Sequence, residues 1–170
     1  TMEIIGHSTL LFRFPCGLNV LTDPVFEDMN TLLYPRKTSP SKSLAELPMI
    51  HVIIISHNHR DHVGEPSMIY LKRFKPYVLV PKGDDVMLDK FNYKCRVVSH
   101  NTWETSTFSI VSSFADGTTS KPNNIRFTSV PANHWSCRTA TDANNSLFLG
   151  WVIHSDNWAG SIYFSGDTAL

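Results

Sequence analysis

The sequence is short of cysteine, of net charge and of long apolar runs, and each shortage excludes a class of protein. Its three cysteines, Cys16, Cys95 and Cys137, are odd in number and widely separated, which predicts free thiols in a reducing compartment and not a disulfide framework. Fifteen basic residues balance fifteen acidic ones, so bulk charge gives no reason to expect a nucleic-acid partner. No apolar stretch is long enough to span a membrane. These absences indicate a cytoplasmic protein that does not bind nucleic acid.

The order of apolar stretches predicts an α+β fold in one domain, residues 1–170. A β-hairpin is expected at residues 9–14 and 18–22, followed by a long loop over 24–43. Strands and helices then alternate, with a strand at 51–56, a helix opening at Glu65, a strand at 77–80, a helix at 85–91 and a strand at 95–98. Only strands follow, at 108–114, 125–130, 147–153 and 161–165. We expect two packed sheets with helices on the outside.

Four potential metal ligands lie within six residues, directly after an apolar strand. They are His57, His59, Asp61 and His62. Imidazole nitrogens and carboxylate oxygens are ligands that zinc and similar metals prefer. Alternation along extended backbone turns His57 and His59 to one side, so one metal can bind both, while Asp61 and His62 can reach a second. A solvated, histidine-rich loop is the alternative interpretation.

Two further candidate ligands follow later strands. His134 comes soon after the strand that ends at Val130, and Asp167 follows Gly166 at the end of the last strand. A glycine before an acid at a strand end lets the backbone approach a ligand closely. Taken alone, His134 would be a histidine at the core edge and Asp167 a turn residue. With the first cluster they predict an open two-metal hydrolytic site and not a closed, cysteine-rich zinc site, although Cys137 remains an alternative ligand.

This ligand pattern resembles that of the metallo-β-lactamase superfamily, which implies an αββα sandwich with a binuclear metal site at the edge between two sheets. More narrowly, the chain is similar to the N-acyl-phosphatidylethanolamine-hydrolysing phospholipase D group and its bacterial relatives. The stretches that carry this likeness run from end to end of the chain, at residues 5–9, 21–26, 47–48, 55–62, 131–139 and 164–168. Lactonases of ascorbate phosphate share much of the opening pattern.

The resemblance implies a role for each ligand. His57, His59 and His134 would hold the first of two zinc ions. Asp61 and His62 would hold the second, with Asp167 bridging, and iron or manganese are the alternatives to zinc. Asp61 and Asp167 would also be catalytic, because they would orient the nucleophile.

Other residues would support the site or bind substrate. Asp23 would accept a hydrogen bond from a ligand imidazole and so fix its tautomer. His7 would line or support the site, with a buried histidine at a strand edge as the alternative. Arg36, Lys37 and Arg138 would pair with a phosphate, with a solvated surface role as the alternative for each.

The function implied by the resemblance is phosphodiester hydrolysis by a zinc-bound hydroxide. For a phospholipid, the products would be phosphatidic acid and an N-acylethanolamine. Two alternatives stay open: a lactonase-like hydrolase of a small phosphorylated metabolite, and a degenerate, non-catalytic module that holds at most one metal. A nuclease is disfavoured by the neutral charge.

One departure from the family concerns the second metal. Family members supply a further histidine from beyond the Gly-Asp strand, whereas no histidine follows Asp167 here. We therefore expect these residues to be the N-terminal, larger part of the domain in a longer protein, with a homo-oligomer or the remaining chain covering exposed sheet. For a phospholipid substrate, peripheral membrane contact would involve the apolar residues of the long loop, which a folded loop core would also explain: Phe26, Met29, Leu32, Leu33 and Tyr34.

Overall fold

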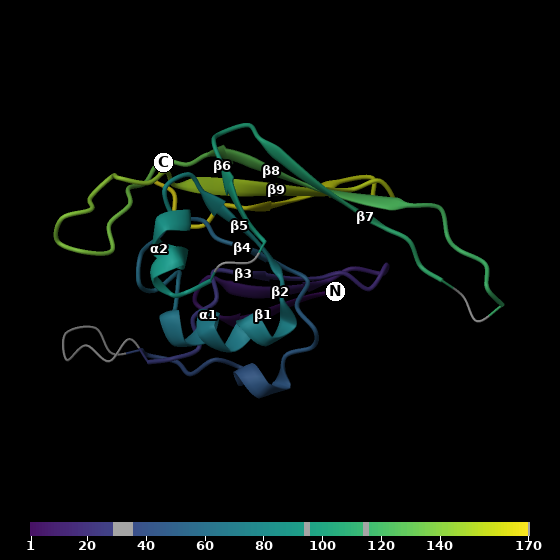
Figure 1. Ribbon diagram of the computed structural model, residues 1–170, viewed down its shortest axis with the longest axis horizontal. Helices are drawn as coiled ribbons and strands as arrows, with labels where there is room; N and C mark the ends of the chain where they lie inside the picture. Colours follow the sequence, from purple (N-terminus) through teal and green to yellow (C-terminus); the bar gives the residue numbers. More distant parts are fainter. Residues whose placement is uncertain (29–35, 94–95, 114–115, 170) are drawn as a thin grey trace.

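The computed structural model describes residues 1–28, 36–93, 96–113 and 116–169. Two stacked β-sheets form the body of the molecule, and two short helices lie on the outer side of one of them (Figure 1). Cys95 and Phe114 lie outside the described residues, as do Met29, Leu32, Leu33 and Tyr34 of the expected loop surface. Phe26, the remaining member of that surface, packs against the core.

The first sheet holds six strands in chain order. They are β1 (Met2–Gly6), β2 (Thr9–Arg13), β3 (Asn19–Thr22), β4 (Val52–Ile54), β5 (Tyr77–Pro81) and β6 (Val97–His100). The pairs β1–β2 and β2–β3 are antiparallel, while β3, β4, β5 and β6 run parallel. Parallel pairing places the carboxyl ends of β3 and β4 at the same sheet edge, where Thr22 stands opposite Ile54. The expected hairpin, central strand and alternating strands are confirmed.

The second sheet is antiparallel, in the order β10-β9-β8-β7. Its strands are β7 (Thr105–Ile110), β8 (Asn123–Pro131), β9 (Leu149–Ser155) and β10 (Ser161–Phe164). The expected run of strands is confirmed, but β7 begins three residues before the predicted start. The strand β1 was not predicted at all. Its outward side chains Met2 and Ile4 are exposed, at 59% and 63%, so its sequence shows no polar and apolar alternation.

Two apolar cores hold the layers together. Helices α1 (Glu65–Leu71) and α2 (Asp85–Lys90) and the 3-10 turns η1 (Leu44–Glu46) and η2 (Lys72–Phe74) complete the elements. Ile53 of β4 faces the helical side with Met68 and Leu88. Its neighbour Ile54 faces the second sheet, where it shares a core with Trp151. Such burial on both faces is typical of a central parallel strand.

The layers are therefore helices, sheet and sheet (Figure 1). Within the described part of the chain, no helix covers the outer face of β7–β10, so three layers of the four-layer sandwich are seen. Proline at the start of α1 is confirmed, since Pro66 stands in its first turn after the Gly64 cap. No helix among these residues is both long and apolar enough to cross a bilayer.

Candidate metal centre

The predicted ligands come together at the edge where strand ends of the two sheets meet. The loop after β4 carries His57, His59, Asp61 and His62, and its backbone is joined to the second sheet. The Trp151 indole N–H donates to the Ile55 carbonyl at 2.8 Å, and the Leu149 N–H donates to the Ser56 carbonyl at 2.8 Å. The loop turns back on itself because the N–H groups of His62 and Val63 both donate to the His59 carbonyl.

Three imidazoles converge on one point, as the sequence predicted. His57 Nε2 lies 2.8 Å from His59 Nδ1, and His134 Nε2 lies 3.2 Å and 3.3 Å from these two atoms. Ligands about 2.0–2.1 Å from a tetrahedral zinc stand about 3.3 Å apart. A neutral imidazole carries one N–H, and a ring that keeps it on the outward nitrogen turns a lone pair to its neighbours, which a cation between the three rings would bind. The donor set therefore fits a metal.

A second group of donors lies beside the first. The buried His62 Nε2 lies 3.3 Å from Asp167 Oδ2 and 4.0 Å from Asp61 Oδ2. It makes no hydrogen bond with any described residue despite the nearby carboxylate. Asp167 Oδ2 also lies 4.0 Å from His134 Nε2, so this carboxylate stands between the two groups, where a bridging ligand is expected. An orphaned, fully buried imidazole nitrogen facing carboxylates also fits a metal.

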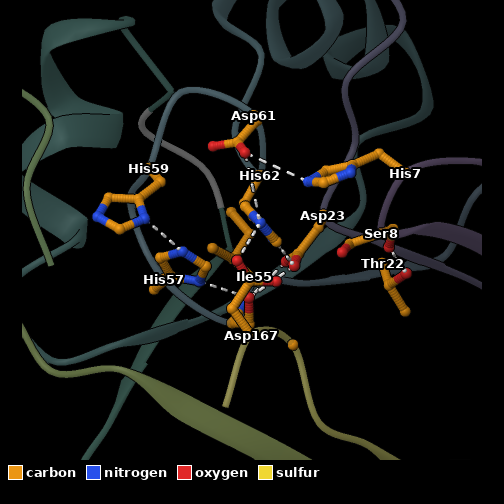
Figure 2. A network of polar contacts seen from close by, with 12 residues as sticks. His7, Ser8, Thr22, Asp23, Ile55, His57, His59, Asp61, His62 and Asp167 are labelled. Carbon is orange, nitrogen blue, oxygen red and sulfur yellow. Dashed lines mark hydrogen bonds and ion pairs between the residues drawn. The ribbon is translucent and has the colours of Figure 1, made fainter. Parts of the chain in front are cut away.

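A buried network under the cluster fixes the ring orientations (Figure 2). Asp23 is fully buried and accepts hydrogen bonds from the Ser56 N–H at 2.8 Å and the Ser56 hydroxyl at 2.6 Å. His62 Nδ1 lies 2.7 Å from the Asp23 carboxylate, and His57 Nδ1 lies 2.9 Å from the Ser56 oxygen. Donation from both Nδ1 atoms leaves a lone pair on each Nε2, which turns to the centre. The role predicted for Asp23 matches this geometry.

Gly166 positions Asp167 through a close approach. It adopts a φ of +55°, and a Cβ built on it would stand 2.4 Å from Ser56 Cβ. The loops of Asp167 and His134 are also tied together, because the Ala169 N–H donates to the Asn133 carbonyl at 2.8 Å. The glycine predicted to permit close backbone packing does so.

Burial keeps two of the imidazoles neutral. It is the largest cause that lowers the pKa of His57, to about 2, followed by the neighbouring imidazoles. Burial and His134 likewise lower the pKa of His59. His62 differs: burial opposes its protonation, but the hydrogen bond and charge of Asp23 raise its pKa overall. Neutral rings with free lone pairs are the form that a metal binds.

Asp61 is held as the carboxylate by His7. The hydrogen bond from His7 is the largest cause that lowers the pKa of Asp61, and it outweighs burial. His7 Nε2 lies 3.3 Å from Asp61 Oδ2, and the His7 side chain is 47% exposed. The alternative of a buried strand-edge histidine is therefore wrong for His7, which reaches the site from the β1–β2 turn.

The three cations predicted to bind phosphate lie in different settings. Arg138 Nη1 donates to the carbonyls of Asn58, at 3.3 Å, and Val63, at 2.9 Å. These hydrogen bonds stabilise the loop that carries His59, Asp61 and His62. Arg36 Nη2 donates to the Val25 carbonyl at 2.8 Å, and its Nη1 is buried without a partner among the described residues. Lys37 is exposed. The contacts of Arg138 are structural, and phosphate binding by all three stays a prediction.

Two contributors were missed by the sequence reasoning. Ser56 links Asp23 to His57. The only sequence signal for this role was its position directly before the histidine cluster. Trp135 is half exposed, and its ring meets that of His59 edge-on, with centroids 4.4 Å apart. It forms an apolar wall beside the first group, although the sequence suggested only a neighbour of His134.

Comparison with known proteins agrees with this geometry. Residues 18–170 match the family model of the Beta-lactamase superfamily domain. The chain is 32% identical over 159 residues to the mitochondrial N-acyl-phosphatidylethanolamine-hydrolyzing phospholipase D of Saccharomyces cerevisiae, covering 89% of this chain and 31% of that protein. It is 28% identical over 179 residues to N-acyl-phosphatidylethanolamine-hydrolyzing phospholipase D 1 of Caenorhabditis elegans, covering 98% and 46%.

The chain thus spans less than half the length of these two relatives. Among solved structures, CmlA, a diiron β-hydroxylase from Streptomyces venezuelae, superposes with a TM-score of 0.65 at 21% identity, over 98% of this chain and 29% of that one. This likeness concerns the fold. With the family model matched over most of its length and its imidazoles and carboxylates gathered at the sheet edge, the chain belongs to the β-lactamase superfamily.

Proposed function

We propose that the protein is a metal-dependent hydrolase that cleaves phosphodiesters, with a phospholipid of the N-acyl-phosphatidylethanolamine class as substrate. The observation that carries the proposal is the pair of adjoining donor groups, three imidazoles in one and carboxylates with His62 in the other. The similarity to two phospholipases D supports the substrate class. The fold alone does not select this chemistry, because CmlA shares it and is a hydroxylase.

The residues present fit two metal ions, with zinc as the first candidate. His57, His59 and His134 would hold one, and Asp61 and His62 the other, with Asp167 between them. When bound, the metals would supply Lewis acidity and lower the pKa of a water molecule towards neutrality.

The chain's own groups then have distinct tasks. Asp167 lies between the donor groups and Asp61 lies beside His62, and both carboxylates would accept a proton from the attacking water and orient it. Asp23 holds the His62 ring so that Nε2 keeps its lone pair. Trp135 presents an apolar face beside His59, which limits water on that side and suits an acyl or other apolar part of a substrate.

The test is a substrate screen on the full-length protein that carries this sequence. Bis-p-nitrophenyl phosphate and N-acyl-phosphatidylethanolamine vesicles would be compared with p-nitrophenyl phosphate and a panel of lactones. We expect turnover of the diesters, and a loss of about 10²-fold or more in Asp61→Asn and His59→Ala.

His154→Ala is the matched control. His154 lies on β9, hydrogen-bonded to Ser161, so removing this imidazole should leave turnover unchanged. Hydrolysis of lactones without diesters would support the lactonase alternative. Diester turnover that survives Asp61→Asn and His59→Ala would contradict the proposed site.

A further inference from the structure

One histidine near the cluster has no ligand role assigned so far. His7 lies in the turn between β1 and β2, far in sequence from the loop that carries Asp61 and His62, and Figure 2 shows its ring pointing at the Asp61 carboxylate. It holds a φ of +41°, which non-glycine residues rarely adopt. The ring centroids of His7 and His62 lie 5.0 Å apart, edge to face. The turn therefore brings a fourth side chain to the second donor group, beside Asp61 and His62.

The distances in this group are close to those of ligands around one ion, and the longer of the two lies between His62 Nε2 and Asp61 Oδ2, at 4.0 Å. His7 Nε2 lies 3.3 Å from Asp61 Oδ2, the separation of about 3.3 Å expected between neighbouring ligands of a tetrahedral zinc. Donor atoms of His7, Asp61 and His62 all lie within 4.8 Å of one another. The first group, His57, His59 and His134, obeys the same limit. Both triads stay within this limit, and the second contains one carboxylate and two imidazoles.

The buried nitrogen of His62 provides an independent sign of a ligand at this point. Its side chain is completely buried, and Nε2 makes no hydrogen bond with a described residue. An unpaired polar atom of this kind costs free energy unless something else binds it. A cation placed among His62, Asp61 and His7 satisfies all three side chains. His62 Nε2 thus marks the place of the ion, and the contact of His7 Nε2 with Asp61 Oδ2, at 3.3 Å, brings the second imidazole to the same place.

We propose that His7 is a direct ligand of the second metal, through Nε2, together with Asp61, His62 and Asp167. This inference rests on the two-metal centre of the proposed function, and it adds a ligand to that centre from the N-terminal turn. From the described residues, the second site then receives two imidazoles and two carboxylates. Such a mixed set suits zinc and also iron or manganese.

The experiment measures metal binding, not turnover. Full-length wild-type protein, His7→Ala, His7→Gln and the control His154→Ala would be stripped of metal and titrated with cobalt(II), with binding followed by calorimetry. The proton spectra of the cobalt-loaded proteins would then be recorded, because each ligating imidazole gives an exchangeable, strongly shifted N–H signal. Unfolding of the metal-free proteins would show that each variant folds.

His7→Gln separates a ligand from a supporting residue. Its amide N–H can still donate to Asp61, but the variant has no imidazole at this position. A residue that merely positions Asp61 would thus be rescued by glutamine, whereas a ligand would not.

For a ligand, we expect wild type and His154→Ala to bind two cobalt ions. His7→Ala and His7→Gln should both bind the second ion at least 100-fold more weakly. At saturating cobalt, His7→Gln should lack one shifted imidazole signal.

Two results would overturn the proposal, and they differ in what else they affect. Two tight cobalt ions in His7→Gln, with the full set of shifted signals, would show that His7 is not a ligand and would leave the proposed function standing. Fewer than two ions in the wild type would remove the two-metal centre itself, and the proposed function with it.

Discussion

The close contact between Gly166 and Ser56 allows the cost of a larger residue at position 166 to be predicted, as a loss of unfolding free energy. Gly166→Ala places a Cβ 2.4 Å from Ser56 Cβ, at a backbone φ of +55°. A side chain in the left-handed region costs about 1–2 kcal/mol, and overpacking a tight contact costs about 1–3 kcal/mol more. We therefore expect the free energy of unfolding to fall by about 2–5 kcal/mol. Relief of the clash also moves Asp167 away from His62 and weakens metal binding.

Two glycines elsewhere separate the causes in a urea-unfolding series. Gly17 has a φ of +87° with nothing within 4 Å of a built Cβ, so Gly17→Ala measures the backbone cost alone. Gly160 has open space and no left-handed φ, so Gly160→Ala serves as the baseline. The reasoning is refuted if Gly166→Ala loses no more stability than Gly17→Ala and binds metal like the wild type.

Three further changes have outcomes set by the contacts around the site. Asp23→Asn removes the charge that His62 Nδ1 and Ser56 contact, and chelator competition should show metal affinity lowered about 10- to 100-fold; unchanged affinity would contradict this role. Burial raises the pKa of Asp84 from 3.8 to about 7, so its contribution to stability is complete below pH 3.8 and is lost as the pH rises through about 7. Urea unfolding of Asp84→Asn should lack that loss, and equal pH slopes in both proteins would argue against it. Arg138→Ala removes two donations to loop carbonyls and should lower stability by about 1.5–3 kcal/mol without raising KM at saturating metal, whereas a higher KM would favour phosphate binding.

The site was largely predictable because its ligands are close in sequence or follow strands. The cluster of His57, His59, Asp61 and His62 follows an all-apolar strand, and a parallel strand of that kind must end at a shared sheet edge. The role of Gly166 was also predictable, because a glycine before an acid at a strand end permits close backbone contact. The hairpin and the alternation of strands and helices followed from turn residues and apolar periodicity.

What was not predictable depends on tertiary pairing. Strand β1 exposes Met2 and Ile4 and is defined by its pairing with β2, which no local pattern reveals. The left-handed φ of His7 is a property of the turn, so sequence reasoning could not decide between a buried and a site-facing ring. The resemblance implied a phosphate partner in Arg138, with a solvated surface role as the alternative, and its hydrogen bonds to the distant carbonyls of Asn58 and Val63 could not be read from the sequence.

The most direct test of the two-metal account is the metal content of the full-length protein, measured by inductively coupled plasma mass spectrometry. The wild type, His134→Ala and His62→Ala would be purified in parallel, with His154→Ala as the control. The account predicts close to two metal ions per chain in the wild type and the control, and close to one in each of the other variants. One ion or none in the wild type would contradict it.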